Sequence, residues 1–269
     1  MIRTKLCSSV IAISTLSVFL AGCGGSGSSG IETPVSGSTY TGVVVDGPLE
    51  GASVFADINR NGTKDAGEPA TVTGKDGHYT LKVPSDIFQP PIIIEVPPTA
   101  IDADSGKPVG KYYRLGAPDG VYSVMNPITT MIKSLMDVNP GLKRTEAESI
   151  VRGYLNLSDT YEIYADYSIV ARPDGVTTDK WDRFLSESGR ARNIGRVTAA
   201  ILGKYWENAQ ASYGGNIPKE KMGMIQALLT EAALKSVAPL AGALPNDGLV
   251  DTDTLTIPDP ALSYEKLEA

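Results

Sequence analysis

Cysteine and histidine are scarce in this chain of 269 residues, which has two cysteines and one histidine. Both cysteines, Cys7 and Cys23, lie near the N-terminus. That distribution excludes a disulfide framework, a Cys/His zinc cluster and a haem-attachment motif from the rest of the chain. A Ser-His-Asp triad would have to use His78, and no Gly-x-Ser-x-Gly elbow is present. Because His78 follows an Asp-Gly turn, we expect an ordinary residue at a strand start.

Basic residues form no long run, and acidic residues outnumber them, so the formal net charge is −7. An acidic chain of this kind argues against binding to nucleic acid or to anionic lipid headgroups. The N-terminal apolar stretch, Val10 to Leu20, is also too short for a permanent transmembrane helix, which needs about 20 residues.

Two positive charges, Arg3 and Lys5, precede this apolar stretch, and small residues end it, as in a secretory signal. The ending Leu20-Ala-Gly-Cys23 resembles the lipobox of bacterial lipoproteins. The resemblance implies a signal peptide over 1–22, cleavage before Cys23 and a diacylglyceryl group on the Cys23 sulfur. An ordinary signal peptide with an incidental cysteine is the alternative. Because Gly24, not aspartate, follows, we expect an outer-membrane lipoprotein, on the periplasmic face or the cell surface.

The remaining chain divides by pattern into a tether, a strand-rich part, a helical part and a tail. A Gly/Ser-rich tether covers 23–38. Short β-branched runs separated by Gly, Pro and Asp over 39–125 predict an antiparallel β-sandwich. Helical spacing of apolar residues over 126–240 predicts an α-helical domain, and 241–269 reads as a polar tail. The predicted fold class is therefore α+β.

Helix boundaries can be placed from capping signals. Asn126-Pro127 predicts a helix start, with an amide N-cap followed by proline. Thr145-x-x-Glu148 fits a capping box for a second helix. Further along, we expect a short helix and two longer ones, at Trp181–Leu185, Ala191–Ala211 and Pro218–Val237.

Residues 57–68 read Asp-Ile-Asn-Arg-Asn-Gly-Thr-Lys-Asp-Ala-Gly-Glu. Oxygen-bearing side chains stand at positions 1, 3, 5, 9 and 12 and glycine at position 6, which is the spacing of a twelve-residue calcium loop. Calcium takes roughly six to eight oxygen ligands, and a coiled loop can turn alternate residues inward to supply them. The predicted Ca²⁺ ligands are Asp57, Asn59, Asn61, the backbone carbonyl of Thr63, Asp65 (directly or through water) and Glu68.

The flanks of this loop differ from those of an EF-hand. Ser53–Ala56 before it is strand-like, and Pro69 after it discourages a helix. We therefore expect the loop to join two strands. The alternative is a turn-rich hairpin without metal, because Asn and Asp favour turns on their own.

The stretch Gly42–Asp57, the loop itself and the strand Gly77-His-Tyr-Thr-Leu81 resemble a known module. It is similar to the B-type repeats of serine-aspartate repeat adhesins and to carboxypeptidase-regulatory-like sandwiches of the transthyretin (prealbumin) type. The resemblance covers about residues 40–97. It implies a calcium-stabilised sandwich that acts as a spacer or binding module, with the loop residues as ligands and no catalytic residues.

Two other groups of residues have alternative interpretations. Asp102-x-Asp104-Ser-Gly106 could hold a second calcium, although a simple turn is the plainer interpretation. Trp181, Tyr205 and Trp206 could stack on sugar, but their helical spacing favours core packing.

We therefore expect a calcium-binding, membrane-anchored lipoprotein that is not an enzyme. It would act as a binding or spacer module in adhesion or envelope assembly, with a protein or polysaccharide as its partner. One alternative is a hydrolase that uses carboxylates, with the sandwich as an accessory domain. Another is a structural subunit that assembles with itself. The sequence predicts neither the ligand nor the oligomeric state.

Overall fold

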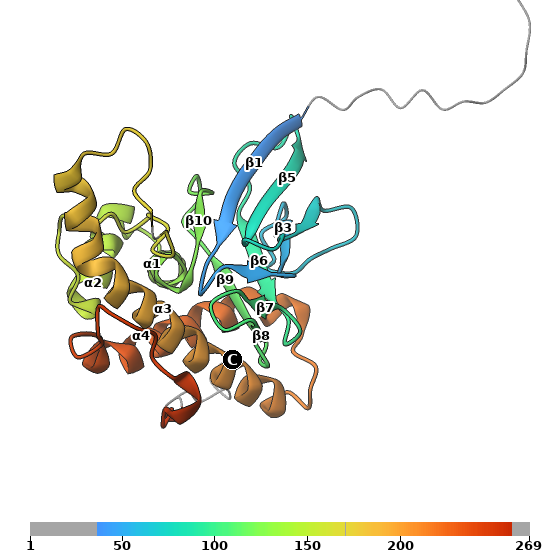
Figure 1. Ribbon diagram of the computed structural model, residues 1–269. Helices are drawn as coiled ribbons and strands as arrows, with labels where there is room; N and C mark the ends of the chain where they lie inside the picture. Colours follow the sequence, from blue (N-terminus) through green and yellow to red (C-terminus); the bar gives the residue numbers. More distant parts are fainter. Residues whose placement is uncertain (1–36, 170, 260–269) are drawn as a thin grey trace, which may run out of the picture. The chain divides into compact units, whose positions relative to one another are not determined.

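The computed structural model describes residues 37–169 and 171–259, which belong to one compact unit (Figure 1). The predicted signal peptide 1–22, Cys23 and most of the predicted tether therefore lie outside the described residues. Among the described residues, all named strands precede Asn126, and all four α-helices follow it. The chain is thus a mixed α and β protein, consistent with the expected α+β class, and its strands form three small sheets.

The first sheet is built on β1 (Gly37–Val44), which pairs antiparallel with β5 (His78–Pro84) and parallel with β10 (Val124–Met125). Strand β5 alternates between exposed and buried residues, so Tyr79, Leu81 and Val83 enter the core. His78 is exposed at the start of β5, as an ordinary strand residue would be.

The second sheet has four antiparallel strands in the order β4-β3-β6-β9. Its inner strand β6 is buried on both faces except at Glu95, which suits its run of isoleucines. A third, very short sheet has the order β2-β7-β8. The bounds are β4 (Ala70–Val72), β3 (Ser53–Ala56), β6 (Ile92–Val96), β9 (Tyr113–Gly116), β2 (Leu49–Glu50), β7 (Ile101–Asp102) and β8 (Lys107–Pro108).

Helix α1 (Pro127–Val138) begins where the sequence predicts it. The Asn126 side chain accepts a hydrogen bond from the backbone N–H of Thr129 at 2.8 Å, and the Thr129 hydroxyl accepts one from the Asn126 N–H at 3.0 Å. The hydroxyls of Thr129 and Thr130 also donate to the carbonyl of Gly116, at 2.8 and 3.1 Å. The first turn of α1 is thereby fixed to the end of β9, beside which it lies in Figure 1.

Two helix predictions are wrong in detail. Helix α2 (Arg144–Leu155) is capped by Glu146, which accepts a hydrogen bond from the Lys143 N–H at 2.9 Å. Glu148, the partner expected in the capping box, instead accepts from the Tyr164 hydroxyl at 2.8 Å. A glutamate two residues earlier thus pairs with the N–H of the N-cap residue Lys143.

The expected short helix and its longer neighbour are one helix, α3 (Thr178–Ser212). No proline interrupts residues 186–190, so nothing there forbids a helix, and contacts with Asn246 hold this segment in place. Helix α4 (Met222–Ala241) follows a short 3₁₀ turn (Lys219–Lys221), and a second 3₁₀ turn (Thr252–Thr254) lies in the predicted tail. None of the helices among the described residues combines the length and the apolar composition needed to cross a bilayer.

Strands and helices share one continuous apolar core. Trp206 and Tyr205 of α3 are almost fully buried in it, as core packing predicts, and the Tyr205 hydroxyl lies 2.7 Å from the Ser236 hydroxyl of α4. Part of the predicted tail also packs against α3. The Asn193 side chain donates hydrogen bonds to the carbonyls of Pro245 and Gly248 and accepts one from the Val250 N–H.

Candidate metal site

The loop from Asp57 to Glu68 joins β3 to β4, as its strand-like flanks predict. The Ala56 N–H donates to the Pro69 carbonyl at 3.0 Å and closes the base of the loop. Inside it, Arg60 and Gly62 have left-handed backbones, with φ of +60° and +75°. Gly62 reaches this conformation without the steric penalty that other residues meet. These two residues coil the chain tightly enough for alternate side chains to face inward.

Asp57 is the most buried of the predicted ligands, with 3% of its surface exposed. Its Oδ1 accepts a hydrogen bond from the Asn61 N–H at 3.0 Å and its Oδ2 accepts one from the Gly62 N–H at 2.9 Å. Burial raises the pKa of this carboxyl, the nearby Glu68 charge raises it further, and the two N–H donors oppose the shift. A cation beside Asp57 would relieve both the desolvation and the repulsion.

The side chains of Asn59 and Asn61 form hydrogen bonds that hold the middle of the loop in a coil. Asn59 Oδ1 accepts from the Asn61 N–H at 3.1 Å, and Asn61 Oδ1 accepts from the N–H and hydroxyl of Thr63 at 2.7 and 2.8 Å. Their amide nitrogens donate to Asp65 Oδ2, at 2.9 Å from Asn59 and 2.5 Å from Asn61. These donors lower the pKa of Asp65. Positive ends of amide dipoles thus lie around the carboxylate that the loop offers at position 9.

Glu68 closes the loop from its far end. Its Oε1 accepts from the Ile58 N–H at 2.7 Å, and its Oε2 accepts from the Asp65 N–H at 2.9 Å. The structure therefore links the five predicted side chains in one hydrogen-bonded coil, but it does not bring the carboxylates of Asp57, Asp65 and Glu68 close enough to enclose a metal ion by themselves. Carboxylate and amide oxygens each have more than one lone pair, so these bonds leave capacity for a cation. The donor set suits calcium, a hard cation that prefers oxygen ligands.

Carboxylates alone do not make this site. Within the described residues, no three carboxylate, thiolate or imidazole side chains come close enough to enclose a metal ion. Three of the six predicted ligands are instead amide or backbone oxygens, which calcium loops use routinely. The fit of the loop to calcium therefore rests on Asn59, Asn61 and the Thr63 carbonyl as much as on the acids.

Several neighbours of the loop were not predicted from the sequence. Arg114 of β9 is fully buried, and its Nη2 donates to the Gly62 carbonyl at 2.5 Å. Its guanidinium also lies 5.9 Å from the Trp206 ring and 3.6 Å from Glu95. Lys219 places its Nζ 3.3 Å from Asp65 Oδ1. A Cβ atom on Gly62 would come within 2.7 Å of the Cα of Gly223, so the loop touches the first turn of α4. In the sequence, the one sign of these contacts was Arg114, a single charged residue within the strand-like run Tyr112–Leu115.

The Asp102–Asp104 turn is tied to helix α3. Arg192 forms hydrogen bonds with both carboxylate oxygens of Asp104, and Arg196 donates to Asp102 Oδ2 at 3.1 Å. Asp46 lies in the same cluster, with its Oδ2 accepting from the Tyr113 hydroxyl at 2.9 Å. Burial raises the pKa of Asp46 to about 7. The two arginines supply the charges that a second calcium would otherwise supply, so the turn needs no metal.

Comparison of the chain with family models, with curated proteins and with solved structures found no match.

Proposed function

We propose that this chain is an exported lipoprotein that is anchored through Cys23 and binds calcium in the Asp57–Glu68 loop. It works as a binding or spacer module at the outer membrane, on the periplasmic face or the cell surface, and not as an enzyme. The observation that carries the proposal is the hydrogen-bonded coil of Asp57, Asn59, Asn61, Asp65 and Glu68. A turn without metal also forms such bonds, but it does not require oxygen side chains at positions 1, 3, 5, 9 and 12 with glycine at position 6.

We further propose that the two larger sheets act as a transthyretin-like sandwich that the calcium loop stabilises. Two features support this. The apolar cluster includes residues of both sheets, among them Leu81 of β5 and Ile94 of β6. The loop also joins β3 and β4 at the base of the second sheet. Calcium would hold together one end of that sheet and the first turn of α4, through the close contact of Gly62 with Gly223.

The test of calcium binding is thermal unfolding of the lipid-free chain with chelator and with millimolar calcium. A ligand that binds only the folded form stabilises it by RT ln(1 + [Ca]/Kd), about 2.7 kcal/mol at a hundredfold excess over Kd. We expect Asp57→Asn and Glu68→Gln to lose this rise. Asp119→Asn is the matched control, because Asp119 pairs with Arg60 of the loop at 2.9 Å but occupies no ligand position. No calcium-dependent shift in the native chain would refute the metal site.

The anchor needs a separate test, because Cys23 lies outside the described residues. In cells fed radiolabelled palmitate, the native chain should carry label and fractionate with membranes. Cys23→Ser should carry none and appear in the soluble fraction. Label that persists in Cys23→Ser would contradict lipidation at this residue.

A further inference from the structure

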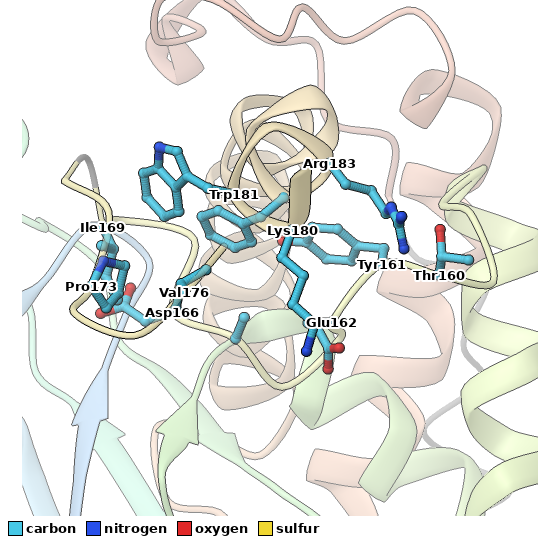
Figure 2. A pocket seen from close by; sticks show the side chains of 12 residues that line it. Thr160, Tyr161, Glu162, Asp166, Ile169, Pro173, Val176, Lys180, Trp181 and Arg183 are labelled. Carbon is cyan, nitrogen blue, oxygen red and sulfur yellow. The ribbon is translucent and has the colours of Figure 1, made fainter. Parts of the chain in front are cut away.

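Phe88 is the most exposed large apolar side chain in the described part of the chain, with 84% of its surface accessible. It lies in the loop 85–91, which joins β5 to β6. By contrast, Trp181 and Phe184 are half-buried beside the cavity of about 310 Å³ shown in Figure 2, with ring centroids 5.3 Å apart. A single exposed apolar residue needs no explanation by itself, so the structure of its loop decides whether Phe88 has a role.

Hydrogen bonds hold the backbone on both sides of Phe88. The Ile87 N–H donates to the Pro84 carbonyl at 3.1 Å, and the Gln89 N–H donates to the Tyr40 hydroxyl at 3.3 Å. The Ile87 side chain is partly buried and packs against the apolar core. The loop therefore fixes Ile87 against the protein and presents Phe88 to the solvent, so the exposure of Phe88 does not come from a frayed segment.

The backbone after Phe88 takes a conformation that few residues adopt. Gln89 is left-handed, with φ of +47°, which is sterically unfavourable for most residues other than glycine. Pro90 and Pro91 follow it, and their rings fix their own φ angles. Such strain persists where the surrounding structure imposes it, and it is concentrated at functional sites. The strain at Gln89 is consistent with a loop shaped to hold Phe88 outward.

Two tyrosines form the base of this loop. The rings of Tyr40 and Tyr122 are partly buried, with centroids 4.5 Å apart. The Tyr122 hydroxyl donates to the Pro90 carbonyl at 3.4 Å, and the Tyr40 hydroxyl accepts from Gln89. Apolar rings with a polar end are enriched where a bilayer meets water. The loop thus combines one apolar tip with two side chains of the interfacial type.

The described part of the chain begins near this loop. Gly37, at the start of β1, pairs with Pro84, at the end of β5, so both lie at the same end of the first sheet (Figure 1). Phe88 follows Pro84 by four positions, and Cys23 precedes Gly37 by 14. A Gly/Ser-rich segment of that length spans roughly 20 Å on average. A lipid on Cys23 would therefore keep the end of the sheet that carries Phe88 close to the bilayer.

The size and charge of the exposed surface favour a bilayer over a protein partner. Between residues 73 and 149, all within the described chain, no other large apolar side chain is exposed. A stable protein interface buries about 800 Å² on each partner, which one side chain does not approach, whereas one aromatic side chain can enter the interfacial region of a bilayer. Asp86, an exposed acid two positions before Phe88, disfavours anionic headgroups. Zwitterionic lipid is therefore the surface that fits.

We propose that Phe88 inserts into the interfacial region of the zwitterionic bilayer to which Cys23 anchors the chain. The inference rests on the proposed anchor, because one apolar group alone binds a bilayer only marginally. Docking through Phe88 holds the start of β1 and the end of β5 against the lipid. The opposite end of the first sheet then faces away from the membrane, which gives the proposed spacer a fixed orientation.

The test is tryptophan fluorescence of the full chain, purified from cells and added to phosphatidylcholine vesicles with or without brominated acyl chains. We expect the tryptophan of Phe88→Trp to emit at shorter wavelength on the vesicles and to lose intensity when the acyl chains are brominated. Val72→Trp is the matched control, because Val72 is 60% exposed but lies in β4, paired with Ser53 at the start of β3. Its tryptophan should emit as in water, without quenching. Both positions are exposed, so neither change should disturb folding.

Trp181 and Trp206 are present in every sample, so difference spectra against the native chain isolate the new tryptophan. A native chain that does not float with the vesicles would refute the anchor and this inference with it. A chain that floats, but whose Phe88→Trp signal is neither shifted nor quenched, would refute the inference alone and leave Phe88 to a protein partner. Equal quenching in Phe88→Trp and Val72→Trp would also overturn it, because the chain would then lie on lipid without a preferred end.

Discussion

The carbonyl oxygen of Gly62 accepts a hydrogen bond at 2.5 Å from Nη2 of Arg114, a residue 52 positions further along the chain. Arg114 is fully buried, and its guanidinium faces the ring of Trp206 in α3 at 5.9 Å. Glu95, 3.6 Å from the Arg114 Nε, brings an opposite charge to it, and the Arg114 charge also acts to lower the pKa of Asp57 in the loop. This one side chain therefore connects Gly62 of the Asp57–Glu68 loop to the helical part of the core.

Replacing Arg114 with methionine should lower the free energy of unfolding by about 2–4 kcal/mol, because the Gly62 carbonyl loses a charged donor and Glu95 its ion pair. The matched control is Arg60→Met. Arg60 lies in the same loop, but its ion pair with Asp119 is exposed on both sides, so we expect a change below about 1 kcal/mol. Urea denaturation of both variants gives the comparison. Equal effects would mean that Arg114 acts only as a surface charge would.

The ammonium group of Lys219 lies beside the carboxylate of Asp65, so a metal ion at that carboxylate would have to compete with it. Its Nζ lies 3.3 Å from Asp65 Oδ1, and its side chain is mostly exposed. We expect Lys219→Met to raise the calcium affinity of the loop by about two- to threefold, a modest gain because solvent screens the pair. Calorimetric titration with calcium measures it. Lys221→Met is the control, because Lys221 instead lies over the Tyr213 ring at 5.7 Å. An unchanged affinity in Lys219→Met would show that the lysine does not compete.

Two local features of this molecule could be predicted from the sequence, although the local cap of α2 was placed two residues too late, and the long-range features could not be predicted. The Asn126 cap and the loop that joins β3 to β4 depend on residues within a few positions of one another. Spacing alone therefore locates them. The partners of Asp102 and Asp104 lie about 90 residues away on α3. No periodicity connects the two segments, so the sequence left a metal and a simple turn as alternatives.

The merger of two predicted helices into α3 has a similar origin. The segment 186–190 contains serines and Gly189, which have weak helix propensity. Tertiary contacts outweigh that weakness, because Asn246 lies against Gly189 and its side chain bonds the backbone of Ser186 and Arg190. The predicted tail thus stabilises the middle of a helix that propensity alone would break.

Asp46 should make the stability of the chain depend on pH. Burial raises its pKa to about 7, whereas an aspartate in an unfolded chain titrates near about 3.9. The native state therefore holds this proton more tightly, and its contribution to stability falls as the pH rises from about 4 to about 7. Asp46→Asn is neutral throughout. The difference in unfolding free energy should shift in favour of the variant by about 2–4 kcal/mol over this range. A flat profile for Asp46→Asn would refute the shift.

Two glycines within helices should respond oppositely to alanine. A Cβ atom on Gly153 of α2 meets nothing within 4 Å, so Gly153→Ala should stabilise the chain by about 0.5–1 kcal/mol through helix propensity. A Cβ atom on Gly189 of α3 would come within 1.6 Å of the Asn246 carbonyl oxygen. The tail must then move off α3 and lose the hydrogen bonds of Asn246 with Ser186 and Arg190. We expect Gly189→Ala to destabilise the chain by about 1–3 kcal/mol despite the better helix former. Hydrogen exchange should also be faster over 243–250 in Gly189→Ala, and unchanged exchange there would mean that the tail does not depend on this contact.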